Sequence, residues 1–266
     1  MTAPIFSLLA AAFYLGGTLY QIRCLMRRRS ASPGLLRSIG LVALLCHAGG
    51  LYVQVFTGNG LSFGFFHVSS LIAWLVLAVT LVFSLRAPVT SLLIGLFPLA
   101  LITDLLAWLF PSHGAAVIPG NSALMIHVLL SILAYGILTI AVFQAGLLAI
   151  QDNQLKHRNP VRFNRTFPPL QTMEALLFQF VLCGEVLLTL SLLSGFVFLD
   201  NMFAQNVAHK TLLSCLAWVV FGILLWGRHF RGWRGSFAIR WTLGGFLLLM
   251  LAYFGSKLVS EFILPM

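Results

Sequence analysis

The sequence predicts an all-α integral membrane protein that crosses the bilayer about eight times. Of the 266 residues, 60% are hydrophobic and only 8% are charged. The apolar residues occur in long uninterrupted runs, and most of the cationic residues lie in every second connection between these runs. An α-helix rises about 1.5 Å per residue, so a run of about 20 apolar residues crosses the hydrocarbon core of a membrane. Both observations therefore indicate a polytopic protein.

Clusters of Arg, Pro, Gly and Asn divide the chain into eight predicted helices, and the connections between them are too short to hold a soluble domain. The start of the chain lacks a positive segment and a small-residue cleavage site, so the first helix is predicted to be retained and not removed as a signal peptide. We expect one membrane domain, 1–266, with four helices in 1–115 and four in 120–266. The predicted helices span about 3–22, 38–56, 65–85, 90–110, 123–149, 174–199, 209–228 and 238–262.

The positive charges predict the orientation of these helices. All of the 16 lysines and arginines except Lys210 and Lys257 lie in the connections between helices 1 and 2, 3 and 4, 5 and 6, and 7 and 8. Because cytoplasmic loops are enriched in Lys and Arg, both termini are predicted to lie outside. The net charge of +10 is then explained by orientation and by contact with anionic membrane lipid, and no nucleic-acid partner is predicted.

Two carboxylic acids fall within predicted membrane segments, Asp104 in the fourth and Glu185 in the sixth. An ionisable residue in the bilayer is costly and commonly functional. Each could be a proton relay or a partner for a histidine. The alternative is a neutral carboxyl group that makes a hydrogen bond between helices.

Four histidines are candidates for cofactor binding because of their predicted depths. His127 and His209 begin the fifth and seventh helices at the outer boundary, His47 lies near mid-membrane, and His229 lies at the cytoplasmic rim. Two neutral imidazoles from different helices at one depth can bind a haem iron from opposite sides. We therefore predict haem as a cofactor with His127 and His209 as ligands of its iron, and His47 with His229 as a weaker second pair. For each histidine taken alone, the alternative is a hydrogen-bonding residue.

The sequence contains no motif that predicts an independent enzyme. No Ser/His/Asp spacing, phosphate-binding loop, zinc motif or nucleotide-binding glycine pattern occurs. The four cysteines are scattered without a CxxC pair, so neither a disulfide framework nor a thiol redox motif is expected. No catalytic residue is proposed.

Several segments carry a family resemblance. They are His127-Val-Leu-Leu-Ser-Ile-Leu-Ala-Tyr135, Leu187-Leu-Thr-Leu-Ser-Leu-Leu-Ser-Gly195, His209-Lys-Thr211 and Trp226-Gly-Arg-His-Phe-Arg-Gly-Trp-Arg-Gly235. They resemble the CcsA, CcmC and HemX group of cytochrome c assembly membrane proteins, and most of all the small bacterial YpjD branch. The resemblance covers 120–266 well and 1–115 more loosely.

The resemblance implies a multi-pass protein of the inner membrane that handles haem for attachment to apocytochrome c on the outer face. Other cytochrome c assembly or membrane proteins are the implied partners. By position, His127 resembles the external histidine of the family, His229 resembles a histidine near the inner end of the following helix, and His47 resembles an early membrane histidine.

The segment before His209 departs from the family pattern. Haem-delivering members have a tryptophan-rich stretch there, whereas residues 200–208 contain no tryptophan and no proline. This departure motivates an alternative, a HemX-like accessory or regulatory subunit that has lost haem delivery and docks a partner through Arg158, Arg162 and Arg165. A further alternative is a small-molecule or proton-coupled transporter that uses Asp104 and Glu185.

Overall fold

The computed structural model describes residues 2–27, 29–57, 60–61, 64–110, 122–156, 168–198 and 208–255. These residues form eight α-helices, a two-residue strand pair (β1, Phe56–Thr57; β2, Gly60–Leu61), a 3-10 turn (η1, Thr90–Leu92) and a π turn (η2, Leu251–Gly255). The helices are α1 (Thr2–Met26), α2 (Pro33–Val55), α3 (Phe65–Phe83), α4 (Leu93–Leu109), α5 (Ser122–Lys156), α6 (Leu170–Phe198), α7 (Ala208–Arg231) and α8 (Ser236–Met250).

Each of the eight predicted membrane segments corresponds to one of these helices. All eight, with η1 added to α4 and η2 to α8, are long and apolar enough to cross a membrane. The predicted all-α polytopic class is therefore confirmed. The boundaries differ at α2, which begins with Pro33 in the first turn where a proline is tolerated, and at α5, which continues through a polar end to Lys156. The last helix, α8, ends at Met250 and is followed by η2, and its predicted end at 262 lies outside the described residues.

The chain divides into two compact units. Unit 1 consists of Met1–Ile118 and Gln154–Pro169, and it contains α1 to α4. Unit 2 consists of Pro119–Asn153 and Leu170–Met266, and it contains most of α5 together with α6 to α8.

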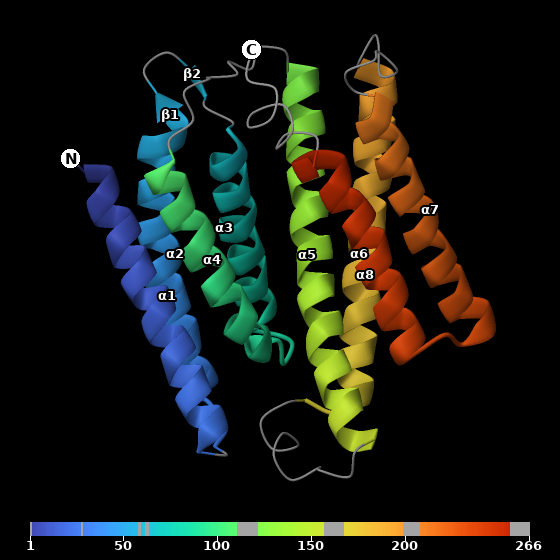
Figure 1. The fold of residues 1–266 in the computed structure, drawn as a ribbon, viewed down its shortest axis with the longest axis horizontal. Helices are drawn as coiled ribbons and strands as arrows, with labels where there is room; N and C mark the ends of the chain where they lie inside the picture. The colour runs from blue at the N-terminus through green and yellow to red at the C-terminus, as the bar shows by residue number, and fades with distance from the viewer. Residues whose placement is uncertain are drawn as a thin grey trace. The chain divides into compact units, whose positions relative to one another are not determined.

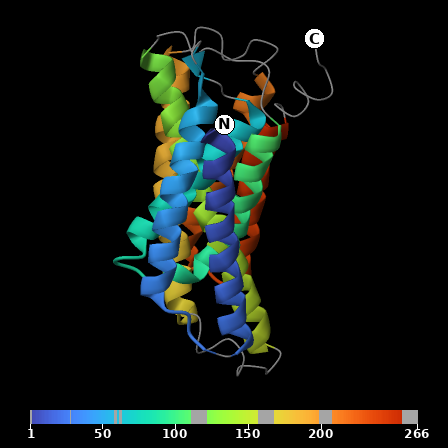
Figure 2. The same ribbon diagram turned by 90° about the vertical axis from the view of Figure 1, so that its left-hand side faces the viewer.

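In unit 1, α1 packs against α2 and α4, and α3 packs against the same two helices. α1 and α2 run antiparallel and lie side by side along most of their length (Figure 1, Figure 2). Small residues permit this close approach, as is usual between membrane helices. A Cβ atom on Gly17 of α1 would lie 3.2 Å from Cγ2 of Ile39 on α2, and one on Gly50 of α2 would lie 3.0 Å from the Ser7 hydroxyl oxygen on α1.

In unit 2, α7 packs against α6 and α8, and a tight turn joins α7 to α8. The Trp233 amide donates to the Gly227 carbonyl at 3.2 Å, and Gly232 adopts φ 65°. A left-handed glycine directly after the last helical residue is a common way to end a helix. The Trp233 ring lies against Gly227 and leaves no space for a Cβ atom there. α5 is tied to α6 by a 2.9 Å hydrogen bond from Gln144 to the Met173 carbonyl.

Candidate functional site

A buried polar network connects α1 and α2 in unit 1. The Gln54 side-chain amide donates to the Ser7 hydroxyl at 3.1 Å. Farther along the two helices, the Tyr14 hydroxyl lies 3.0 Å from Nδ1 of His47. Ser7 and Tyr14 are seven residues apart, and so are His47 and Gln54. Two turns of helix bring a side chain back to nearly the same face, so the facing helices make two polar pairs in one antiparallel register.

Helices α3 and α4 complete this network around the same histidine. The Ser70 hydroxyl of α3 lies 2.8 Å from Nε2 of His47, and Ser7 donates to Oδ1 of Asp104 on α4 at 3.1 Å. That carboxylate oxygen lies 3.7 Å from Nε2 of His47. The His47 and Asp104 side chains have no exposed surface. Four helices therefore meet at one polar centre.

The structure thus shows Asp104 as the partner of a histidine, one of the roles that the sequence left open. Both ring nitrogens of His47 are hydrogen-bonded to protein groups, and the side chain is sealed inside the helix bundle. Oδ2 of Asp104 and Oε1 of Gln54 are buried and have no partner within the described residues. A charged group in such surroundings is stabilised by pairing, which explains why the acid and the base lie together.

His127 has different surroundings at the beginning of α5 in unit 2. Its Nδ1 lies 3.0 Å from the Ser191 carbonyl oxygen and 3.0 Å from the Ser194 hydroxyl oxygen, both on α6. A carbonyl oxygen can only accept, so the ring hydrogen is on Nδ1. In the described part of the chain, Nε2 has no hydrogen-bond partner, and its lone pair is available to a metal.

A second contact fixes the same part of α5 to α6. The Ser131 hydroxyl donates to the His127 carbonyl at 2.8 Å and lies 2.7 Å from the Ser191 hydroxyl oxygen. Because the Ser131 hydrogen is used in the first bond, the Ser191 hydroxyl donates in the second. The ring of His127 is therefore held by the Ser191 carbonyl, and the Ser191 side chain is itself hydrogen-bonded to Ser131 of α5.

The other candidate histidines lie apart from one another. His209 is exposed at the beginning of α7, and α5 and α7 begin at the same end of unit 2 (Figure 1). His229 is exposed near the other end of α7, with its ring 4.8 Å from that of Phe230. His47 belongs to unit 1. The structure therefore places His127 and His209 at one end of one unit and divides the weaker pair, His47 and His229, between two units.

Glu185 lies between α6 and α7. A Cβ atom on Gly222 would lie 3.5 Å from its Oε1, and its Oε2 has no partner among the residues that the structure describes. Glu185 belongs to unit 2 and Asp104 to unit 1, so each unit has its own buried carboxyl group.

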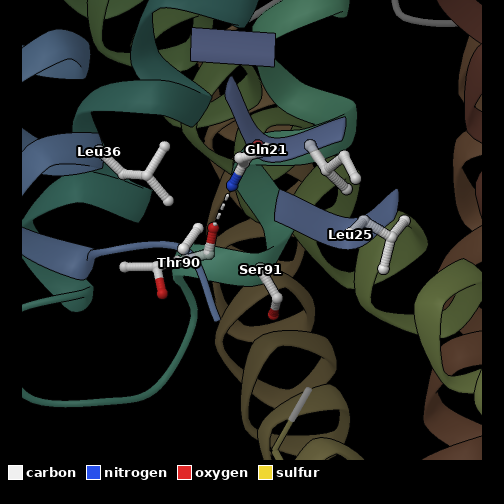
Figure 3. A pocket seen from close by; sticks show the side chains of 7 residues that line it. Gln21, Leu25, Leu36, Thr90 and Ser91 are labelled. Carbon is white, nitrogen blue, oxygen red and sulfur yellow. Dashed lines mark hydrogen bonds between the residues drawn. The ribbon is translucent and has the colours of Figure 1, made fainter. Parts of the chain in front are cut away.

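A separate pocket lies in unit 1 where α1 approaches η1 (Figure 3). The Gln21 side-chain amide donates to the Thr90 carbonyl at 3.1 Å in this pocket. The lining residues are Gln21, Leu25, Ala31, Leu36, Thr90, Ser91 and Ile94. None of them is a histidine, so this pocket is separate from the predicted haem ligands.

Comparison with known proteins identifies the family. A family model described as "Cytochrome C assembly protein" matches residues 35–264. The chain belongs to this family. It is 31% identical over 262 residues to "Inner membrane protein YpjD" of Escherichia coli (strain K12), with 98% of this chain and 99% of the relative covered. No solved structure shows a significant match.

Two further relatives match about half of the chain. "Protein HemX" of Brevibacillus brevis is 24% identical over 147 residues, which is 54% of each chain. "Cytochrome c biogenesis protein CcsA" of Chlamydomonas reinhardtii is 28% identical over 142 residues, 52% of this chain and 38% of the relative. These matches confirm the resemblance seen in the sequence. The eight apolar helices and the family together identify a multi-pass protein of the inner membrane, and family membership supports a role in handling haem.

Sequence reasoning raised Asp104 as a partner for a histidine without saying which one, and it missed the hydroxyl and carbonyl partners of His47 and His127. For His47, the available signal was the seven-residue spacing of polar residues on two consecutive helices. For His127, the backbone carbonyl that holds the ring has no signature in the sequence. Residues 200–207, Arg158, Arg162 and Arg165, on which the accessory-subunit alternative rests, lie outside the described residues.

Proposed function

We propose that this cytochrome c assembly protein binds haem at the end of unit 2 where α5 and α7 begin, with His127 and His209 as the iron ligands. The observation that carries the proposal is the hydrogen bond from Nδ1 of His127 to the Ser191 carbonyl. This bond fixes the ring and leaves Nε2 as the basic nitrogen, which is the arrangement usual for metal-binding histidines.

The residues at this end of unit 2 fit a haem group. His209 is exposed and can approach a ligand from outside the helix bundle, and Lys210 beside it offers a cation to a propionate. No three His, Cys, Asp or Glu side chains gather within the described chain. A haem iron needs no such cluster, because the porphyrin supplies its other ligands. When bound, haem supplies an iron centre that accepts axial imidazole.

We infer that this end of unit 2 faces outside the cell. In unit 2, Arg228, Arg231, Arg234 and Arg240 lie in or beside the turn from α7 to α8, and this turn is at the end of the unit opposite to the beginnings of α5 and α7 (Figure 1). Loops rich in Lys and Arg remain in the cytoplasm. The positions of His127 and His209 would then allow haem to be presented to an acceptor on the outer face.

Haem binding is tested with the purified full-length protein in detergent. The absorption spectrum of reduced haem is recorded for the parent and for His127→Ala, His209→Ala and His229→Ala. The first two variants should lose or shift the haem bands, and His229→Ala should leave them unchanged. His229→Ala is a matched control because it removes an exposed histidine from the other end of the helix that carries His209.

Absence of haem from the parent, or a spectrum unchanged in both outer variants, would overturn the proposal. Loss of the bands in His229→Ala alone would instead favour the second predicted pair, His47 and His229. That pair stays a prediction, and one ring nitrogen of His47 would have to give up its present hydrogen bond to bind iron.

One alternative is an accessory subunit without haem, which is favoured by the missing tryptophans in residues 200–208. It predicts a crosslinked protein partner that is lost when Arg158, Arg162 and Arg165 are replaced by glutamine. The transporter alternative predicts proton-coupled flux that depends on both Asp104 and Glu185. Substitution of each carboxyl group by the corresponding amide, with flux measured in liposomes, checks it.

A further inference from the structure

The turn between α7 and α8 is fixed to α6 by one arginine. Nη1 of Arg228 donates to Oε1 of Glu174 at 2.7 Å and to the Trp233 carbonyl at 3.2 Å. The same guanidinium lies 4.6 Å from the centre of the Phe178 ring. Together with the glycine-ended turn, these contacts hold the segment 226–241, here called the basic hairpin, in one conformation. They also neutralise the charge of Arg228.

Three further arginines of the basic hairpin have no acidic partner within the described residues. Arg231, Arg234 and Arg240 are exposed. The guanidinium of Arg231 lies 5.3 Å from the centre of the Trp226 ring. Because Glu174 is already paired with Arg228, these three positive charges remain available to an anion from outside the chain.

Exposed aromatic side chains accompany the three arginines. Trp226 is 50% exposed, Phe230 68% and Phe237 41%. The rings of Trp233 and Phe237 are 4.3 Å apart, and Phe237 stacks on Trp241 at 5.8 Å. Tryptophan and tyrosine are enriched where a membrane helix meets the headgroup region. The basic hairpin therefore combines cations for a phosphate with apolar surface for the part of a lipid next to it.

The basic hairpin also lies at the correct level for a lipid headgroup. One membrane span, His209–Arg231, ends within it, and the next, Ser236–Gly255, begins within it. The turn between them is at the end of unit 2 opposite to the beginning of α7 (Figure 1). Side chains at such a boundary meet the phosphate and glycerol layer of the bilayer.

We propose that the basic hairpin is a specific binding site for an anionic glycerophospholipid. Arg231, Arg234 and Arg240 hold its phosphate group, and the exposed rings of Trp226 and Phe230 pack against its glycerol and upper acyl chains. Forked guanidinium groups suit phosphate oxygens. The site does not depend on haem, so its failure would leave the proposed function unaffected, and failure of haem binding would leave this site in place.

The test is native mass spectrometry of the full-length protein in detergent, titrated with phosphatidylglycerol or phosphatidylcholine. The parent should retain phosphatidylglycerol in preference to phosphatidylcholine. The triple variant R231Q/R234Q/R240Q should bind phosphatidylglycerol about a hundredfold more weakly, since each arginine near a headgroup contributes about a fivefold factor.

The triple variant R23Q/R27Q/R29Q is the matched control. These three arginines are also exposed. Arg23 lies in the last turn of α1, and Arg27 and Arg29 follow that helix. They take part in no ion pair or cation–π contact with the described chain. The control should keep the affinity of the parent within about threefold. An equal loss in both triple variants, or no loss in either, would overturn the proposal because charge alone would then account for binding.

A competition experiment separates a lipid from a free anion. Inorganic phosphate at the same concentration should not displace phosphatidylglycerol from the parent, because it makes no contact with the aromatic side chains. Displacement by inorganic phosphate would show a simple anion site and would overturn the assignment to a lipid.

Discussion

The two units place a histidine in opposite surroundings. In unit 1, His47 has no exposed surface, and both of its ring nitrogens contact hydroxyl groups. In unit 2, His127 is half-buried, and among the described residues only its Nδ1 has a hydrogen-bond partner. Both histidines lie in membrane helices, so depth alone does not determine which of their ring nitrogens are available to a ligand. A histidine is arranged for metal binding when one ring nitrogen has no protein partner and a hydrogen bond holds the other in place.

Replacing each histidine by leucine gives the largest expected difference. His47→Leu removes the base beside Asp104 and takes the His47 ring away from the Tyr14 hydroxyl, which should lower the free energy of unfolding by about 3 to 5 kcal/mol. His127→Leu should lower it by about 1 kcal/mol or less, since water can reach the freed groups. Unfolding of the purified protein by SDS measures both, and equal losses would contradict the comparison.

Two neighbouring glycines of α1 provide the next test of how tightly unit 1 is packed. A Cβ atom on Gly17 would collide with the buried ring of Phe97, whereas one on Gly16 would meet nothing within 4 Å. Gly17→Ala should lower the free energy of unfolding by about 2 kcal/mol through overpacking. Gly16→Ala should raise it by up to about 1 kcal/mol through helix propensity. The same SDS titration measures both, and a change of the same sign in the two variants would argue against this packing.

The smallest expected effects come from the serine partners of the two histidines. Ser70→Ala leaves Nε2 of the sealed His47 without the hydroxyl that it contacts, at a cost of about 1 kcal/mol. Ser194→Ala leaves His127 its backbone carbonyl partner and should change stability by a few tenths of a kcal/mol. If haem is bound as proposed, Ser194→Ala should weaken binding several-fold, which a haem titration followed by absorbance would detect. A larger stability loss for Ser194→Ala than for Ser70→Ala would reverse the comparison.

The membrane helices could be predicted from the sequence because hydrophobic length is a local property. The basic connections were equally visible, since cationic residues such as Arg228 and Arg234 stand outside the apolar runs. Helix ends were less accurate because a helix can continue through polar residues beyond the hydrocarbon, as α5 does before Lys156. The predicted positions of His127 and His209 near the beginnings of the fifth and seventh helices followed from the same reasoning.

The contacts of the candidate site needed the structure. Whether Asp104 meets His47 depends on the register and rotation of α2 and α4, which hydrophobicity does not specify. The orientation of the His127 ring depends on a backbone carbonyl that any residue at position 191 would present. The sequence therefore identifies the polar side chains in the membrane helices, and the packing of the helices determines which of their atoms have protein partners.

The two polar pairs between α1 and α2 also restrict how unit 1 can assemble after its helices enter the membrane. A slip of one helical turn, about 5.4 Å, would separate Ser7 from Gln54 and Tyr14 from His47 at the same time. Apolar surfaces in lipid tolerate such a slip, whereas unpaired polar groups in hydrocarbon do not. The network therefore favours one register of the α1–α2 hairpin over registers displaced by a turn.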